Sequence, residues 1–183
     1  MPNVLVLKRE IEEKIEKKFS KISIMQAEEE FEQLCFDYGM EFELTDSKEM
    51  MNRFDESKEP EPVYKIEVAA NRYDLLSLEG LTFALRSFLY KEPQPKISIV
   101  NVENPITITV DESTKEVWPV VVAAILRDLN FDQDKYNSFI ELQDMLHNNI
   151  CRWRTLVSMG THDLDKVEGN ISYEAQPPGE ISF

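Results

Sequence analysis

Apolar residues recur at two different spacings along the chain, and the spacing changes near residue 93. Before that point they repeat mainly every three or four positions, which is typical of helices that bury one face. After it they mostly alternate with polar residues, which is typical of half-buried strands. The first region predicts strands at 4–7 and 63–68 and helices at 11–19, 23–38 and 75–89. The second region predicts strands at 97–102, 106–110, 117–129, 152–159 and 171–173, with a helix around 134–147.

The helix predicted at 23–38 has signals at both ends. Ser23 followed by Gln26 is a capping-box pattern, and Gly39 stands where a left-handed carboxyl-terminal cap is expected. Its acidic run at 28–32 reads as a solvated face. At the amino end of the later helix, Asp132 or Asp134 can act as the cap.

The run Asn-Arg-Tyr-Asp at 71–74 joins a predicted strand to the apolar helix that follows it. Asn71 or Asp74 can cap that helix. Upstream, residues 45–62 are charged and aperiodic and end in a proline pair, so they read as a surface loop. Downstream, the prolines of KEPQPK at 91–96 mark the expected domain boundary. The sequence therefore predicts an α+β protein with domains at 1–92 and 93–183.

Charge and composition narrow the class of protein. The chain carries 35 acidic and 20 basic residues, so its average field repels nucleic-acid phosphates. Two widely spaced cysteines do not describe a disulfide framework, which indicates a reducing compartment. No apolar run approaches the length of a membrane span or a signal-peptide core. We expect a cytoplasmic protein without a membrane partner.

No single motif, taken alone, is strong evidence for a catalytic or binding site. No glycine-rich phosphate loop is present among the five glycines. A four-ligand zinc site would need all of the chain's cysteines and histidines, so we predict no metal site. No pairing of a serine or cysteine nucleophile with a base can be read from the spacing. The segment 147–165 has a local positive spot at Arg152 and Arg154, and it is interpreted either as a functional segment or as a strand followed by a capped polar loop.

Several motifs in a fixed order carry a family resemblance. They are QLCFDYGMEFEL at 33–44, YKIEVAANRYDLLSLEGL at 64–81, VVAAILRDLNF at 121–131 and YNSFIELQDMLHNNICRWRTLVSMGTHDLD at 136–165. Together they resemble the amino-terminal part of the β subunit of cytosolic phenylalanyl-tRNA synthetase, of the eukaryotic and archaeal type. The resemblance implies that residues 1–92 form a small helical module with a few short strands. It also implies that residues 93–183 begin a mixed α/β editing module that deacylates tRNA.

The resemblance implies a function for the parent enzyme. Such an enzyme is a ligase with two α and two β chains that uses ATP and Mg²⁺ to attach phenylalanine to its tRNA. The β chain hydrolyses tyrosine wrongly attached to that tRNA. A second site is needed because an apolar pocket rejects an isostere with one extra hydroxyl only weakly. We expect this chain to bind no cofactor itself and to have an α subunit and tRNA as partners.

The same resemblance implies the site residues. Thr161 and His162 stand where the bacterial branch of the family has a Thr-Asn pair in its editing pocket, so we expect them to line that pocket. Asn149 and Arg152 are expected at its rim or on the tRNA end. No residue is assigned to the aminoacylation reaction. On its own, the chain is expected to be inactive and to self-associate through unpaired strand edges.

One alternative belongs to a different class of protein. The chain can also be read as an acidic, non-catalytic interaction module derived from the synthetase, with the first domain and the helix at 75–89 as its docking surface. The net charge of −15 fits either reading. Copurification with an α subunit separates the two readings.

Overall fold

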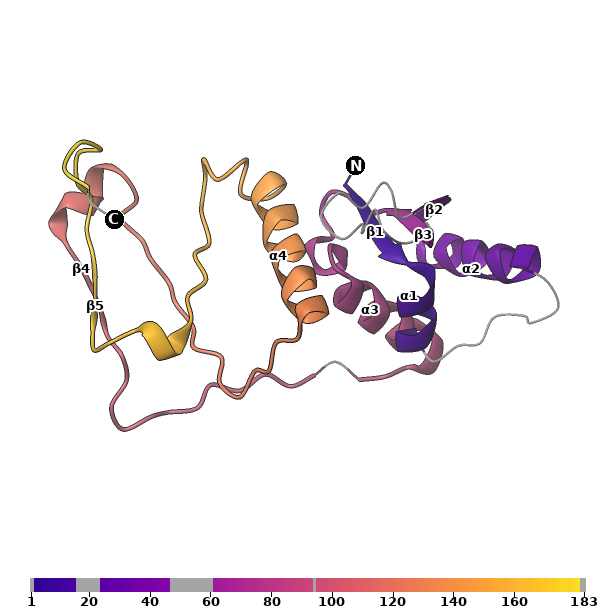
Figure 1. Cartoon of the computed structure of the whole chain (residues 1–183), viewed down its shortest axis with the longest axis horizontal. Coiled ribbons are helices and arrows are strands. Elements are labelled where there is room, and N and C mark those ends of the chain that lie inside the picture. The colour runs from indigo at the N-terminus through magenta and orange to yellow at the C-terminus, as the bar shows by residue number, and fades with distance from the viewer. Residues whose placement is uncertain (1, 16–23, 47–60, 94, 182–183) are drawn as a thin grey trace. The chain divides into compact units, whose positions relative to one another are not determined.

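The computed structural model describes residues 2–15, 24–46, 61–93 and 95–181 (Figure 1). The chain divides into two compact units. The first unit comprises Met1–Pro95 and Phe131–Met159, and the second comprises Lys96–Asn130 and Gly160–Phe183. The predicted capping box at Ser23 lies outside the described residues, as does most of the predicted surface loop at 45–62.

The first unit is built on a three-stranded antiparallel sheet in the order β1-β3-β2. Its helices contribute buried side chains to a single core on one face of that sheet. The predicted strands at 4–7 and 63–68 are confirmed, and β2 was not predicted. The elements are β1 (Asn3–Leu7), α1 (Lys8–Ile15), α2 (Ile24–Tyr38), β2 (Glu41–Asp46), β3 (Pro62–Glu67), α3 (Leu78–Tyr90) and α4 (Gln133–Asn148).

Three aromatic rings form the centre of this core. Phe31 of α2 stacks on Tyr64 of β3 with ring centroids 4.3 Å apart, and the Phe42 ring of β2 meets Phe31 edge-on at 5.4 Å. Phe31 and Tyr64 are both fully buried. The register pairs Phe42 with Ile66, so alternate residues of β2 and β3 point to the same face. The helix-facing side of the sheet therefore carries the main core, and Leu7 and Val63, at the alternate positions, form a smaller buried cluster on the other side.

The ends of α2 and α3 are set by specific caps. Gly39 has φ +89°, its N–H donates to the Phe36 carbonyl at 3.0 Å, and the Met40 N–H donates to the Cys35 carbonyl at 2.8 Å. This is the left-handed cap that the glycine predicted. The cap predicted for α3 is wrong, because Ser77 takes that position and its hydroxyl accepts from the Gly80 N–H at 3.1 Å. The corner at 71–74 instead leads into a short 3₁₀ turn (Tyr73–Leu75).

Helix α4 belongs to the first unit, although its sequence lies in the predicted second domain. Asp132 caps it, as one of the two predicted residues, by accepting from the Lys135 N–H at 2.8 Å. Leu142, Met145 and Leu146 pack against the main core. The assignment of residues 93–183 to an editing module stays a prediction, since compactness does not identify a module.

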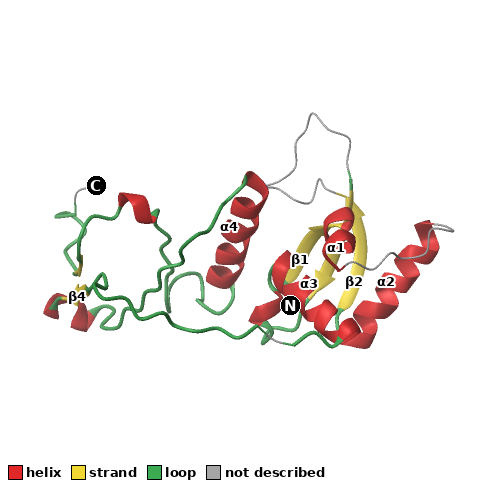
Figure 2. Cartoon of the chain, turned by 90° about the horizontal axis from the view of Figure 1, so that it is seen from below, coloured by secondary structure: helices red, strands yellow, loops and turns green. Residues whose placement is uncertain are grey.

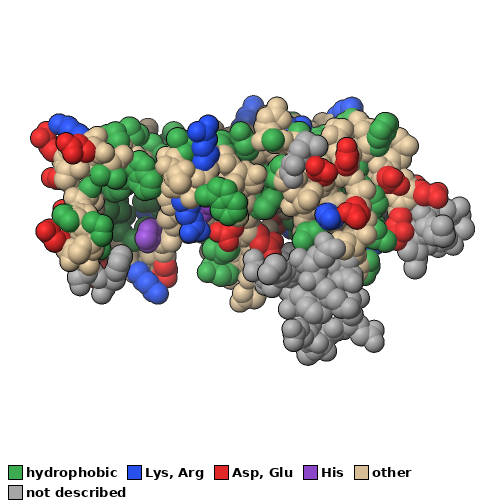
Figure 3. All heavy atoms as spheres, turned by 90° about the horizontal axis from the view of Figure 1, so that it is seen from above, with side chains coloured by type: hydrophobic (Ala, Val, Ile, Leu, Met, Phe, Trp, Pro, Cys, Tyr) green, Lys and Arg blue, Asp and Glu red, His purple; other side chains and the backbone are tan. Residues whose placement is uncertain are grey.

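The second unit contains little regular structure (Figure 2). Its strands β4 (Ile108–Val110) and β5 (Ile171–Tyr173) pair in parallel, which confirms the strand at 171–173 and part of that at 106–110. Two 3₁₀ turns (Glu112–Glu116 and Leu164–Lys166) accompany them. In Figure 3, hydrophobic side chains in green lie on the surface at the left end, the part that contains β4 and β5.

The strands predicted at 97–102 and 117–129 are wrong for the structure described. Both segments are irregular, and apolar side chains such as Ile99 and Val122 are more than nine-tenths exposed. An alternating pattern needs a neighbouring strand for its backbone hydrogen bonds, and neither segment has one among the described residues.

The α+β class is confirmed by the mixture of helices and short strands. In the described ranges, no helix combines the length and the apolar character that crossing a bilayer would require. The strand predicted at 152–159 is wrong: residues 152–155 form turns and residues 156–159 are irregular, as described with the site below.

Candidate functional site

The corner at 71–74 is a closed polar cluster. Arg72 donates two hydrogen bonds to the Asp74 carboxylate, from Nε to Oδ1 at 2.9 Å and from Nη2 to Oδ2 at 2.8 Å, and Nη2 also donates to the Tyr38 hydroxyl at 2.8 Å. These hydrogen bonds hold the pKa of Asp74 below its usual range. The Tyr38 ring meets Phe88 of α3 edge-on at 5.6 Å. The cluster therefore ties the end of α2 to α3, and its polar groups are occupied by structural contacts.

Gly80 explains the close approach of α3 to this corner. A Cβ atom at this position would overlap the backbone carbonyl oxygen of Asp74 and lie 3.1 Å from its carbonyl carbon. The Gly80 N–H is also the donor that the Ser77 cap accepts from. A glycine is required here by space, not by backbone conformation.

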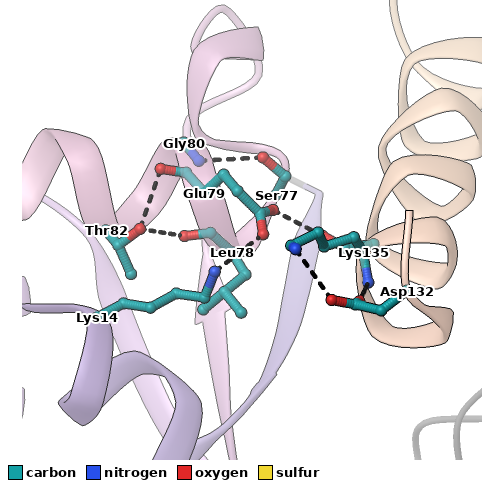
Figure 4. Close-up of polar contacts among 9 residues, drawn as sticks. Lys14, Ser77, Leu78, Glu79, Gly80, Thr82, Asp132 and Lys135 are labelled. Atoms are coloured by element: carbon teal, nitrogen blue, oxygen red, sulfur yellow. Dashed lines mark hydrogen bonds and ion pairs between the residues drawn. The ribbon is translucent and has the colours of Figure 1, made fainter. Parts of the chain in front are cut away.

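A second polar cluster connects three helices of the first unit (Figure 4). Glu79, in the first turn of α3, pairs through Oε1 with Lys14 Nζ of α1 at 3.2 Å. Its Oε2 accepts from the Ser138 hydroxyl of α4 at 2.6 Å. Burial raises the pKa of Glu79, but the hydrogen bonds from Ser138, the helix backbone and Lys14 outweigh it and hold that pKa below 4.5. The ionised carboxylate thus joins α1, α3 and α4.

Glu79→Gln is expected to lower the free energy of unfolding of the first unit by about 1 kcal/mol near neutral pH, since the pair is half exposed. Because folding depresses the pKa of Glu79, its contribution is complete above pH 4.5 and is lost as the pH falls through the folded-state pKa. The difference between the native chain and the variant should therefore shrink as the pH is lowered below 4.5 and the carboxylate becomes protonated. Urea unfolding followed by circular dichroism across this range measures it.

Glu112→Gln is the matched control, because Glu112 is an exposed carboxylate of the second unit. It should leave the unfolding of the first unit unchanged at every pH. A stability difference for Glu79→Gln that persists undiminished at low pH would contradict the role given to the carboxylate.

The four predicted site residues are divided between the two units. Thr161 and His162 lie in the second unit, with exposed side chains, just before Asp163, which caps a short turn by accepting from the Asp165 N–H at 3.1 Å. Asn149 and Arg152 lie in the first unit, directly after α4. The structure brings the members of each pair together, since the Arg152 N–H donates to the Asn149 carbonyl at 3.1 Å. The predicted pocket as a whole stays a prediction.

The turn after α4 replaces the strand predicted at 152–159. Arg152, Trp153 and Arg154 have φ values of 48°, 57° and 63°, so three successive residues other than glycine are left-handed. This conformation costs about 1–2 kcal/mol per residue. Hydrogen bonds back to the end of α4 offset that cost, among them Trp153 N–H to the His147 carbonyl at 2.8 Å. Sequence reasoning missed this turn because no glycine or asparagine marks its left-handed positions.

His147 lies beneath this turn and is 2% exposed. Arg154 Nε is 3.1 Å from its Nδ1, and the backbone nitrogen of Met159 is 2.9 Å from its Nε2. A neutral imidazole has one unprotonated nitrogen, so one of these two contacts at a time is a hydrogen bond. Arg154 also pairs with Asp144 at 3.3 Å. The histidine is therefore a structural residue that holds both ends of the segment 152–159.

The cysteines do not form a chemical site in the residues described. Burial, followed by the charge of Glu32, raises the pKa of the Cys35 thiol to about 12, so it stays protonated and unreactive at neutral pH. Cys151 is buried as well. Within the described ranges, no group of three or more histidine, cysteine, aspartate or glutamate side chains is arranged to hold a metal ion.

Comparison with known proteins gives a consistent set of relatives. Residues 1–91 match the family model described as the Phe-tRNA synthetase beta subunit B1 domain. A Caenorhabditis elegans phenylalanine–tRNA ligase beta subunit is 48% identical over 167 residues, which are 86% of this chain and 28% of that protein. The Saccharomyces cerevisiae beta subunit is 38% identical and matches 100% of this chain with 28% of its own length. An Arabidopsis thaliana relative, 43% identical over 90% of the chain and 29% of its own length, is named cytoplasmic.

One solved structure extends the likeness to the fold. It is an N-terminal fragment of the phenylalanyl-tRNA synthetase beta subunit from Pyrococcus horikoshii, with a TM-score of 0.74 and 28% sequence identity. The match covers 95% of this chain and 45% of that fragment. The chain therefore spans under a third of the length of these curated relatives, and its similarity to them includes residues of both units.

Proposed function

Because the chain belongs to the phenylalanyl-tRNA synthetase β-subunit family, we propose that it works as part of a phenylalanine–tRNA ligase that attaches phenylalanine to its tRNA. The observation that carries the proposal is the similarity at 38–48% identity across 86–100% of the chain. Its natural partners are then a synthetase α subunit, in an assembly of two α and two β chains, and phenylalanine tRNA. Its site of action is the cytoplasm, as the name of the Arabidopsis relative suggests.

Within this ligase, the first unit serves as a folded support without chemistry of its own. Its signature corner at 71–74 uses Arg72 and Asp74 to fasten α2 to α3. Glu79 fastens α4 to the same core. ATP and Mg²⁺ are used by the parent enzyme and are held outside this chain. The isolated chain is accordingly inactive in aminoacylation.

The second unit contributes to an editing site that hydrolyses tyrosyl-tRNA. Thr161 and His162 are the residues proposed to line it, supported by their exposed position and by the fixed turn at Asp163. The threonine hydroxyl would position the scissile ester or the attacking water. As water adds to the ester carbonyl and the C–O bond to the tRNA breaks, the leaving tRNA oxygen takes the proton from water and becomes the terminal hydroxyl, so the protein only positions the reactants. Asn149 and Arg152 are proposed to contact the tRNA end.

Thr161→Ala in the full-length β subunit, assembled with its α subunit, tests the editing role. We expect deacylation of tyrosyl-tRNA to slow by at least about tenfold, because positioning is lost, while charging with phenylalanine is unchanged. Thr109→Ala, on an exposed position of β4, is the control and should affect neither reaction. Normal deacylation by the Thr161 variant would refute the assignment, and failure of the chain's full-length form to copurify with an α subunit would refute the ligase itself.

A further inference from the structure

The left-handed turn at 151–155 presents an unusual pair of side chains. Trp153 is 75% exposed, and the guanidinium of the neighbouring Arg152 has no hydrogen bond or ion pair within the described part of the chain. Arg154, on the other side, is engaged by His147 and Asp144. One arginine thus anchors the turn, and the other stands free beside an exposed indole.

The turn is held in place by its own hydrogen bonds. Thr155 Oγ1 donates to the Arg152 carbonyl at 2.6 Å, the Leu156 N–H donates to the Cys151 carbonyl at 3.2 Å, and the buried Cys151 closes its inner side. Because three successive left-handed residues are costly for side chains other than glycine, these hydrogen bonds are what hold the turn in one backbone arrangement. A ligand that meets Trp153 therefore meets a surface that is already ordered, which reduces the entropy lost on binding.

The local charge differs from that of the rest of the chain. Residues 145–162 are the longest stretch of the sequence without an aspartate or glutamate, and they contain both arginines of the turn and both histidines of the chain. The nearest upstream carboxylate, Asp144, is paired with Arg154. In a chain of net charge −15, this is the place where a polyanion meets the least repulsion.

We propose that this turn is a contact for single-stranded RNA, in which an unpaired base stacks on the Trp153 indole and Arg152 pairs with the adjacent phosphate. An aromatic face combined with a free guanidinium is the arrangement that binds unpaired nucleotides with little sequence preference. A protein partner would use the same aromatic residue, but it gains nothing from a stretch cleared of carboxylates. The proposal rests on the tRNA-linked function above. It adds base stacking on Trp153 to the Arg152 contact proposed there, and it is separate from Thr161.

Fluorescence of this chain tests the contact directly, because it has two tryptophans. In a Trp118→Phe background, Trp153 is the sole indole, and a single-stranded oligoadenylate of about eight nucleotides, added at low salt, should quench it in a saturable way. Trp153→Ala should weaken binding of the fluorescently labelled oligonucleotide at least fivefold, and Trp153→Phe should retain most of it. Arg152→Ala should weaken binding and reduce the slope of log K against log salt by about 0.7.

Trp118→Ala is the matched control, since Trp118 is 41% exposed in the second unit, and it should leave the affinity unchanged. Circular dichroism checks that each variant is folded, which a substitution at so exposed a residue should preserve. Equal loss of affinity from both tryptophan variants, or no saturable quenching of Trp153, would overturn the proposal. So would a Trp153→Ala chain that binds RNA normally but no longer copurifies with an α subunit, since the turn would then be a protein contact. None of these measurements depends on deacylation. A negative result here would therefore overturn the RNA contact without bearing on the editing role of Thr161.

Discussion

Phe31→Ala is expected to lower the free energy of unfolding of the first unit by about 3–5 kcal/mol, which is a large share of the stability of a small domain. The ring is fully buried between Tyr64 and Phe42, so its removal loses both the transfer free energy and the contacts of two aromatic neighbours. Urea unfolding followed by circular dichroism measures the change in midpoint. If the slope of the unfolding free energy against urea concentration is the same in both chains, the mutation has changed the stability and not the amount of surface exposed on unfolding.

Phe36→Ala is the matched control on the same helix. Phe36 is 76% exposed, five positions from Phe31, so its substitution should change the unfolding free energy by no more than about 0.5 kcal/mol. The two variants share residue type, helix and substitution and differ in burial. Equal effects from the two would show that the aromatic centre described for the first unit is wrong.

Gly80→Ala is expected to destabilise the first unit by about 3 kcal/mol, although alanine is the better helix former by about 1 kcal/mol. The added methyl group would overlap the Asp74 carbonyl oxygen, so either the corner or the first turn of α3 must move. Because Ser77 caps this same turn through the Gly80 N–H, the displacement also weakens the cap. Thermal and urea unfolding of the variant give the change.

Gly179→Ala supplies the comparison, because no heavy atom lies within 4 Å of the Cβ that it would add and Gly179 is not in the left-handed region. This variant should unfold like the native chain. If Gly80→Ala were instead stabilising, helix propensity would outweigh the contact, and α3 would have to lie farther from Asp74 than described.

The elements of the first unit were largely predictable because most of its core lies within one continuous region. Ile11 and Ile15 on α1 and Leu81 and Leu85 on α3 repeat at helical spacing, and all four are buried. Strand β2 was not predicted because it begins only two residues after Gly39 and its alternation of apolar and polar residues covers only a few positions. The α3 cap was misplaced since Asn71, Asp74 and Ser77 are all acceptable caps, and packing against Gly80 selects among them.

The second unit was less predictable for a different physical reason. The alternation at 97–102 predicts which side chains of a strand would lie on each face of a sheet, but it does not specify which segment would pair with that strand. β4 and β5 pair residues 108–110 with residues 171–173, which are far apart in the sequence. No local pattern of residues specifies such a long-range pairing. The same limit applies to Glu79 and Ser138, whose 2.6 Å contact spans 59 residues of sequence.

The candidate site residues were predicted from the family resemblance and not from the spacing of residues along the chain. Thr161 and His162 were identified by a motif in register with a family, and no periodicity marks them as functional. Trp153 lies within the same motif at 136–165, but the resemblance gave it no role. Its exposure depends on a left-handed backbone that the sequence gives no sign of, so only the structure separates it from the apolar residues around it.

The strand order β1-β3-β2 has a consequence for synthesis of the chain on the ribosome. The first strand made is an outer strand, and the central strand that it pairs with, Val6 opposite Tyr64, is made tens of residues later. At about 5–20 residues per second, β1 waits several seconds for its partner. Until β3 is made, the nascent chain contains the two outer strands, β1 and β2, without the central strand that pairs with both. A pause in translation ahead of β3 would therefore prolong the period in which β1 and β2 can pair with wrong partners.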